Sequence, residues 1–342
     1  MHDGRGGPRR ADPRTAPTHR SMLLQLPQNM LVVPVWNLVT LVVAAVVVAQ
    51  LVCFLVALYE MMNLPEMRRV ALGPRALAGV FPNLVLETLG TVVAVLTLPL
   101  GAVPWRRVAG AATSPRPPLV FVPGYAMTRA CLWPLRHRLA AAGWANAVGY
   151  NYRTLRGDLE IAARGLRAAI ADVATACGTS HVVVIAHGMG GLVARLCLRD
   201  WIDAPVCALV TLGTPHRGSK LYALALDPMA REMRPESAVL DALADDELPR
   251  RLDVTAIYSS FDVTVVPSSG GQYPGASNIE IEGVGHVGLL WSPRVVELVR
   301  ENLEFALATA SRADVSAPEG ARRERQAAPS APTQRATSSS SE

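Results

Sequence analysis

One stretch of the chain combines residue types that can present a reactive group at a sharp turn. Residues 181–186 read HVVVIA, residues 187–191 read HGMGG, and LVARLCLRDW follows. A buried strand, a tight turn with small residues and a helix N-terminus lift one residue above a sheet, an arrangement known as a nucleophile elbow. Its usual pattern is G-x-S-x-G, whereas residues 186–190 read AHGMG. The pattern therefore predicts an elbow that has Gly188 at the nucleophile position.

This glycine removes the atom that nucleophilic chemistry at such a turn requires. Gly188 has no hydroxyl, and acyl transfer needs a hydroxyl oxygen as the attacking atom. No Cys or Ser adjoins the turn, since Ser180 precedes the strand and Ser219 lies well beyond it. Glycine also relieves the backbone strain of the turn, so stability alone tolerates the residue. Anion binding by the Gly-rich helix start at 188–191 is an alternative interpretation.

The elements around this turn alternate between apolar strands and helices. Within 158–176 the apolar residues recur at spacings of three and four, which indicates one buried helix face with Asp158 as its N-cap. We expect strands at 119–122, 145–151, 181–186, 207–212, 254–259 and 278–281, and helices at 130–142, 158–176, 190–201 and 292–307. The alternation predicts the α/β class, with a mostly parallel sheet covered by helices on both faces. Chemistry in such sheets lies at the carboxyl ends of the strands.

With these motifs in place, residues 119–305 resemble the α/β-hydrolase fold of bacterial lipases and esterases, whose elbow reads G-H-S-M-G-G. Four further segments match that family in chain order. They are FVPGY at 121–125, TLGTPHRGS at 211–219 and the pair SSFDVTVVP at 259–267 with GVGHVGLL at 283–290. Two departures accompany the glycine at the apex: Ala186 stands for the first glycine of the elbow, and Pro123 for a histidine.

The resemblance implies roles for individual residues. Asp262 takes the position of the acid, and His286 that of the catalytic histidine. Backbone N–H groups of Tyr125 or Ala126, together with Met189, take the position of the oxyanion hole. His187 and His216 are structural in such proteins, and the resemblance implies no catalysis by them.

Two apolar runs precede this domain. Residues 31–58 carry no charge and are too long for the apolar part of a cleaved signal peptide, so a transmembrane helix is expected there. A second transmembrane helix is expected at 84–105, where Glu87 is the only charge before Arg106; a buried or interfacial helix is the alternative. Arginines flanking the runs favour a hairpin with both chain ends in the cytoplasm. We therefore expect an integral protein of the inner (cytoplasmic) membrane with a cytoplasmic globular domain.

The remaining segments are polar connections. We expect a disordered tail at 1–30, a linker at 111–118, a hydrolase domain at 119–309 with a lid or cap at 221–250, and a disordered tail at 310–342. In lipases the region corresponding to 221–250 covers the acyl pocket. A plain helical crossover is the alternative.

Composition narrows the class of protein. Of 342 residues, 50% are hydrophobic and only 18% are charged, which indicates membrane segments beside a globular part. The net charge of +5 comes from arginine, because Lys220 is the only lysine, and no nucleic-acid-binding motif accompanies it. Five cysteines without CxxC spacing predict neither a disulfide framework nor a zinc site. We expect no metal and no cofactor.

These observations lead to one main hypothesis and two alternatives. The chain is expected to be a membrane-anchored lipase/esterase-like protein that is catalytically impaired at Gly188 and retains a pocket for an acyl-ester or membrane-lipid ligand. Alternatively, it is an active lipid esterase in which His286 and Asp262 activate water directly. The third hypothesis is another reaction in which His286 acts as a general base.

Overall fold

The computed structural model describes residues 28–63, 74–103, 105, 116–244 and 252–316. The chain divides into two compact units, 1–47 and 48–342. The expected tails and linker lie mostly outside the described residues, namely 1–27 of the first tail, 111–115 of the linker and 317–342 of the last tail.

The two N-terminal apolar runs both form helices. Helix α2 covers Gln28–Asn63, and its part Trp36–Asn63 is long and apolar enough to cross a membrane. Helix α4 covers Pro74–Leu96, and a short 3-10 helix, η2, follows at Leu98–Ala102. The run expected as one span at 84–105 is therefore divided, and its apolar helical part, Phe81–Leu96, is shorter than the part of α2 that could cross a membrane.

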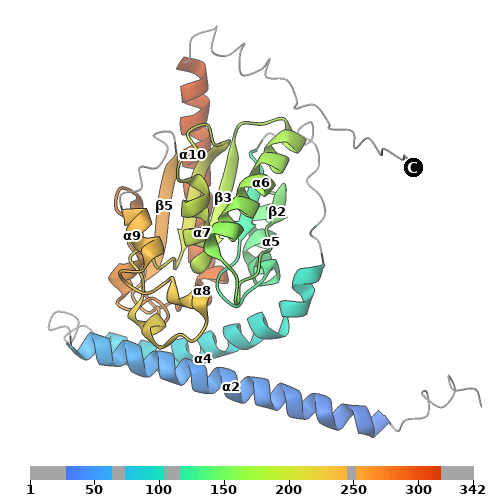
Figure 1. Ribbon diagram of the computed structural model, residues 1–342, viewed down its shortest axis with the longest axis vertical. Coiled ribbons are helices and arrows are strands. Elements are labelled where there is room, and N and C mark those ends of the chain that lie inside the picture. Colours follow the sequence, from blue (N-terminus) through green and yellow to red (C-terminus); the bar gives the residue numbers. More distant parts are fainter. Residues whose placement is uncertain (1–27, 64–73, 104, 106–115, 245–251, 317–342) are drawn as a thin grey trace, which may run out of the picture. The chain divides into compact units, whose positions relative to one another are not determined.

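A six-stranded parallel sheet forms the centre of the globular domain (Figure 1). Its strands are β1 (Leu119–Val122), β2 (Ala147–Gly149), β3 (Val182–His187), β4 (Val206–Leu212), β5 (Asp253–Ser259) and β6 (Ser277–Ile281). They lie in the order β2-β1-β3-β4-β5-β6, and every neighbouring pair is parallel. All residues of β1, β3 and β4 are buried, as expected for central strands with helices on both faces.

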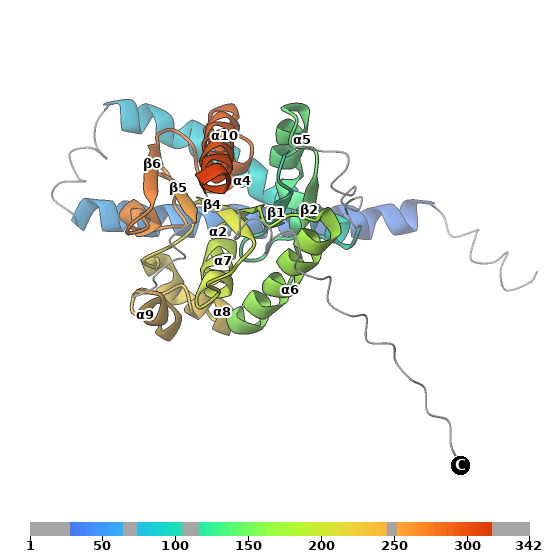
Figure 2. The same ribbon diagram turned by 90° about the horizontal axis from the view of Figure 1, so that it is seen from above.

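Helices cover both faces of this sheet, as Figure 2 shows. Helices α6 (Leu159–Cys177) and α7 (Met189–Leu198) pack on one face, where Val120 and Val122 contribute to the core. Helices α5 (Trp133–Ala141) and α10 (Pro293–Ser316) pack on the other, where Leu119 and Phe121 point. This alternation divides the apolar core into two layers because successive strand residues face opposite sides.

Most of the predicted elements are present with small shifts at their ends. Helix α6 begins as expected, because the Asp158 carboxylate accepts a hydrogen bond from the Ile161 N–H at 2.8 Å. The expected helix at 130–142 begins instead with a 3-10 turn, η4 (Arg129–Leu132), before α5. Helix α10 continues to Ser316, beyond the predicted end at 307 and into the segment expected to be a disordered tail.

The insertion expected as a lid or cap consists of short helices after β4. These are η5 (Lys220–Leu224), α8 (Pro228–Arg231) and α9 (Ala238–Ala244), and two further 3-10 turns, η6 (Ser268–Gly271) and η7 (Gly288–Leu290), follow later in the chain. Residues 245–250 of the insertion, and residue 251 after it, lie outside the described residues. The interpretation of this insertion as a lid stays a prediction.

Candidate active site

The turn between β3 and α7 has the backbone geometry that the sequence pattern predicts. Gly188 adopts φ 52° and ψ −127°, a conformation that L side chains rarely adopt. Its N–H donates to the Leu212 carbonyl at 2.9 Å, and its own carbonyl accepts from the Gly191 N–H at 3.0 Å. These bonds join the apex of the turn to the end of β4 and to the first turn of α7. Gly188 is thereby held at the edge of the sheet where the strands end.

Asp262 and His286, which lie on loops after β5 and β6, form a buried pair at the same edge. The distance from His286 Nδ1 to Asp262 Oδ2 is 2.6 Å. The other carboxylate oxygen, Oδ1, accepts the N–H groups of Thr264 at 2.7 Å and Val265 at 3.0 Å. The loop backbone thus orients the carboxylate, and the carboxylate orients the imidazole ring, as in an acid–base pair.

The free side of this imidazole points at the apex of the turn. A Cβ atom built on Gly188 would lie 3.1 Å from His286 Nε2 and 3.5 Å from Cε1. A side chain at position 188 would therefore contact the nitrogen that is not bonded to Asp262. The structure brings together the three residues that the sequence singled out, although they are up to 98 positions apart in the chain.

Opposing effects act on the proton affinity of His286. Burial by itself lowers its pKa, but the negative charge of Asp262, the hydrogen bond to Asp262 and the charge of Glu87 outweigh burial, so the pKa of His286 lies above the ordinary value of 6.5. The imidazolium form is therefore stabilised beside two carboxylates.

His187 lies beside His286, and its pKa is shifted in the opposite direction. Its ring is 4.5 Å from that of His286 between centroids, and its Nε2 is 3.1 Å from the His286 carbonyl oxygen. A carbonyl accepts, so Nε2 carries the proton. Burial, reinforced by the proximity of His286, lowers the pKa of His187 to about 3. The ring is thus a neutral donor that supports the His286 backbone.

The second histidine expected to be structural also lies in a buried contact. His216 Nε2 is 2.9 Å from Thr211 Oγ1, and its ring stacks on Tyr273 at 4.5 Å. Burial lowers the pKa of His216 below its ordinary value. Ser219 donates its hydroxyl to the Thr264 carbonyl at 2.7 Å and accepts from the Val266 N–H at 2.9 Å. That hydroxyl holds the Asp262 loop.

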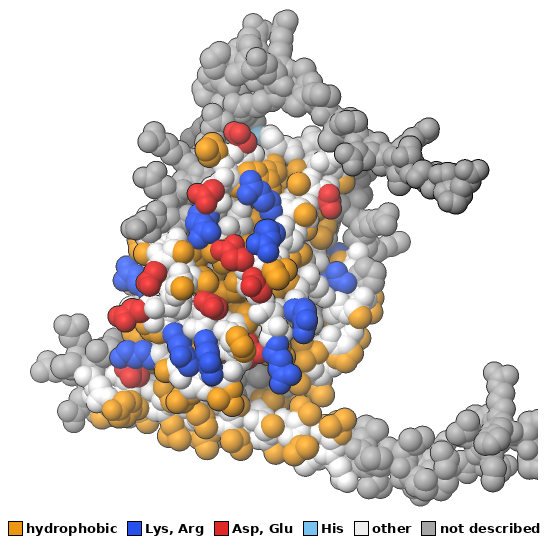
Figure 3. Space-filling view, in the orientation of Figure 1, with side chains coloured by type: hydrophobic (Ala, Val, Ile, Leu, Met, Phe, Trp, Pro, Cys, Tyr) orange, Lys and Arg blue, Asp and Glu red, His pale blue; other side chains and the backbone are white. Residues whose placement is uncertain are grey.

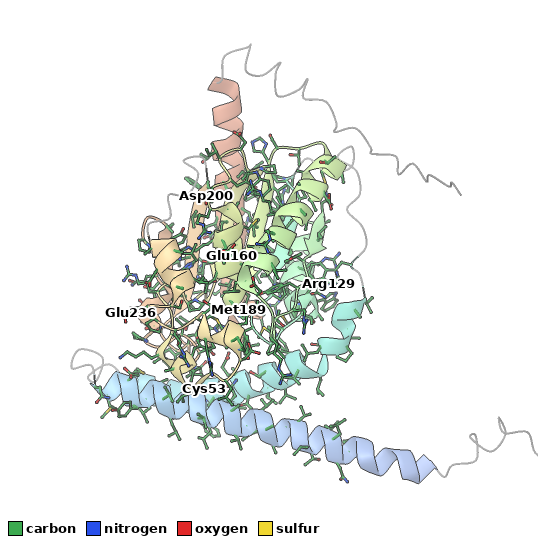
Figure 4. All side chains as sticks on the ribbon, in the orientation of Figure 1. Cys53, Arg129, Glu160, Met189, Asp200 and Glu236 are labelled. Carbon is green, nitrogen blue, oxygen red and sulfur yellow. The ribbon has the colours of Figure 1, made fainter. Side chains whose placement is uncertain are left out.

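The residues expected at the oxyanion hole lie on the β1 and β3 sides of the turn. Met189 is the first residue of α7 and is buried, and Figure 4 labels it at the lower end of that helix. Ala126 has a positive φ of 54°, and its N–H points to the Thr154 carbonyl at 3.5 Å. Between the two expected alternatives after β1, this geometry favours Tyr125 over Ala126, because the Ala126 N–H already has a protein acceptor.

One residue near the pair was not identified as functional from the sequence. The Glu87 carboxylate, on α4, accepts the N–H of Val287 at 2.9 Å and that of Gly288 at 2.7 Å. These are the two residues that follow His286. The sequence did contain a signal, namely a single acid in an apolar run. A buried carboxylate requires hydrogen-bond donors, so such an acid indicates a specific contact. The identity of the donors depends on tertiary structure.

Two kinds of site are not seen in the described part of the chain. No group of three or more His, Cys, Asp or Glu residues there is arranged to hold a metal ion. All five cysteines are free thiols, four of them buried and Cys53 half-buried.

Comparison with known proteins agrees with this fold. Residues 157–230 match the family described as "PGAP1-like alpha/beta domain". Lipase B of Aspergillus fumigatus superposes with a TM-score of 0.50 at 22% identity, over 58% of this chain and 56% of that chain. The globular part has the α/β-hydrolase fold.

A further solved structure that this chain resembles is also a lipase. The mature lipase BlEst2 of Bacillus licheniformis matches with a TM-score of 0.48 at 16% identity, over 58% of this chain and 95% of that one. By contrast, the chain spans little more than half the length of the Aspergillus lipase B chain that it matches.

Proposed function

We propose that this chain is a membrane-anchored protein of the lipase/esterase type. Its acid–base pair is assembled, but the residue at the nucleophile position has no hydroxyl group. Asp262 and His286 are the proposed acid and base, and Gly188 takes the place of a serine. The proposed ligand is an acyl ester or membrane lipid held at the carboxyl edge of the sheet. Ester turnover through an acyl-enzyme is impaired, because no atom is available to form the covalent bond.

The single observation that supports this proposal is the direction of His286. Its Nδ1 is 2.6 Å from Asp262, and its Nε2 is 3.1 Å from the position of a Cβ on Gly188. A serine hydroxyl at this apex would lie within reach of the imidazole. Met189 and Tyr125 are the proposed backbone donors for an ester oxygen that becomes negative during the reaction.

A second candidate function follows from the intact pair. Here His286 Nε2 removes a proton from a water molecule in the space next to Gly188, and the resulting hydroxide attacks the ester carbonyl carbon. The tetrahedral intermediate then expels the alkoxide, which takes the proton from His286, so that an acid and an alcohol leave. Asp262 stabilises the imidazolium between the two steps. Other reactions with His286 as general base would use the same proton transfer.

Three variants of the full chain in detergent distinguish these functions. We expect Gly188→Ser to hydrolyse short- and medium-chain aryl esters at least about 100-fold faster than wild type, since loss of such a nucleophile costs up to about 10⁶ in turnover. Gly188→Ala is the matched control, because it adds the same Cβ without the oxygen. His286→Ala tests the base.

Each result has a defined meaning. Activity in Gly188→Ser alone supports the impaired hydrolase. Activity in wild type that disappears in His286→Ala supports activation of water. Folded proteins that lack activity in all forms, Gly188→Ser included, would contradict an ester-binding pocket.

The proposal places the protein in the inner (cytoplasmic) membrane with its globular domain in the cytoplasm. Helix α2 is long and apolar enough to provide the anchor, and five free thiols are compatible with a reducing compartment. A reporter fused after Ser316 that is active only in the cytoplasm is expected to be active. Activity of a periplasmic reporter at the same junction would show that the globular domain lies on the opposite side of the membrane.

A further inference from the structure

Helix α4 and the turn that follows it have two distinct faces. The buried positions are Glu87, Gly90, Ala94 and Gly101, at spacings of three, four and seven. On the other side a row of large apolar residues is exposed. It consists of Phe81 (72% exposed), Leu86 (63%), Leu89 (57%), Leu96 (49%), Leu100 (58%) and Val103 (60%). We call this set the outer row.

The buried face is attached to the hydrolase domain at points along the whole segment. Near its middle, Glu87 accepts two backbone N–H groups from the His286 loop at 2.9 Å and 2.7 Å. The approach is so close that a Cβ on Gly285 would lie 2.2 Å from Glu87 Cγ. At the far end, the Asn151 side-chain amide donates to the Gly101 carbonyl at 2.8 Å.

These attachments conflict with a position across the bilayer. A hydrocarbon core is about 30 Å thick, whereas the 16 apolar residues Phe81–Leu96 span about 24 Å as a helix. A spanning α4 would also take Glu87 and the two N–H groups that it binds into the hydrocarbon, together with the loop of His286. Separating them instead would leave a carboxylate and two donors unpaired, which is strongly unfavourable in an apolar medium.

The outer row nevertheless needs an apolar partner. Contiguous exposed apolar surface of this kind marks a protein or membrane contact. Two observations favour lipid. The Gln50 amide of α2 donates to Thr91 of α4 at 2.7 Å, so α4 adjoins the apolar helix that is proposed as the membrane anchor. Hydrophobic side chains also gather along α2, whereas charged side chains are interspersed with other residues over the rest of the visible face (Figure 3).

We propose that α4 does not cross the membrane but lies along its surface, with the outer row inserted at the boundary between headgroups and acyl chains. The inner face of the same helix carries the His286 loop. The carboxyl edge of the sheet therefore faces the bilayer, and its ligand comes from the membrane lipids. This inference rests on the membrane anchoring proposed above but does not depend on whether the site is catalytic.

Spin labels on the full chain test the position of α4. The variants Phe81→Cys, Leu89→Cys and Leu100→Cys are prepared in a Cys53→Ala background, in which the four remaining cysteines are buried. Each is reconstituted into vesicles of phosphatidylcholine and phosphatidylglycerol, and label depth is measured by power saturation with oxygen and a water-soluble nickel complex. Ile202→Cys is the control, because it is an apolar residue that is 86% exposed outside the outer row.

We expect the three α4 labels at similar shallow depths, about 5–10 Å below the headgroups, and the Ile202 label in water. A Leu89 label near the bilayer centre, with the other two near opposite surfaces, would show a span and overturn the inference. Three labels in water would overturn it as well. Resistance of the same vesicles to alkaline carbonate reports α2 separately, so loss of anchoring is distinguished from failure of α4 to bind lipid.

Discussion

At the scale of single residues, the decisive position is Gly188. Its φ of 52° lies in the region that glycine occupies readily and that other residues reach only with strain. A Cβ there would also be 3.1 Å from His286 Nε2, so the ring must move by a few tenths of an ångström to accept it. Glycine at this apex thus removes both the hydroxyl and a source of instability.

A stability prediction follows for this position. Gly188→Ser and Gly188→Ala are both expected to lower the free energy of unfolding by about 1–3 kcal/mol, because each places a side chain in the strained conformation. Urea unfolding of the two variants and wild type measures the difference. A loss confined to one variant would show that the hydroxyl, rather than the backbone, determines the cost.

The two histidines of the site give a prediction for pH. Burial holds the pKa of His187 at about 3, far below the 6.5 of an unfolded chain, so the unfolded state binds more protons between these values. His187 therefore reduces stability as pH falls from 6.5 towards 3. The raised pKa of His286 has the opposite sign: its contribution is complete below about 6.5 and is lost as pH rises through the folded-state value.

Histidine ring titrations followed by NMR in micelles measure both effects. We expect the His187 ring to stay neutral to near pH 3 and the His286 ring to titrate above 6.5. In His187→Gln the loss of stability on acidification is expected to be smaller than in wild type, and His181→Gln serves as the control. A His187 ring that titrates near 6.5 would contradict the buried contact.

At the scale of elements, the loop of His286 depends on a helix 200 positions earlier in the chain. Glu87 accepts the N–H groups of Val287 and Gly288, which lie at the start of the 3-10 turn η7. The apolar surroundings make this carboxylate an effective acceptor for both donors. Helix α4 thereby sets where the imidazole stands relative to Gly188.

Glu87→Gln is expected to lower the pKa of His286 and to loosen its loop, because the amide removes a negative charge and offers only one acceptor oxygen. NMR titration of the His286 ring and hydrogen exchange of the Val287 and Gly288 amides report the two effects. Glu297→Gln is the matched control, since Glu297 is a half-buried residue of α10 that is paired with Arg300 at 2.6 Å. An unchanged His286 titration in Glu87→Gln would show that Glu87 has only a structural role.

The N-cap of α6 gives a second prediction for an element. Asp158→Ala is expected to cost about 0.5–2 kcal/mol of stability, because the Ile161 N–H loses its acceptor. Asp172→Ala, on the exposed side of the same helix, is the control. Equal unfolding midpoints in urea for the two variants would contradict the capping role.

At the scale of the whole molecule, α2 is expected to retain the protein in the membrane. Val48 and Val52 are 61% and 44% exposed on that helix. Changing both to Arg adds about 2.5–3.5 kcal/mol each to the cost of insertion, so we expect the full chain to become extractable by alkaline carbonate. The Val48→Leu and Val52→Leu pair should remain in the membrane fraction. Retention of the Arg variant would place the anchor elsewhere.

Several features of this molecule were predictable from the sequence because they depend on local physics. Continuous apolar runs between turn residues predict β3 and β4, three-and-four spacing predicts α6, and a small-residue turn predicts the conformation of Gly188. The lack of a hydroxyl at position 188 is a property of the sequence alone. Asp262 and His286 were expected from resemblance, and the structure places them 2.6 Å apart.

Tertiary structure decided what depends on contacts between distant segments. Glu87 is one acid in an apolar run until folding brings it to the loop of His286, and no spacing rule encodes a contact across 200 positions. Likewise, hydropathy measures how apolar 84–105 is but not whether one face of it has a protein partner. Periodicity depends on residues that are close in the sequence, whereas the contact partner of a side chain is determined only when the whole chain packs.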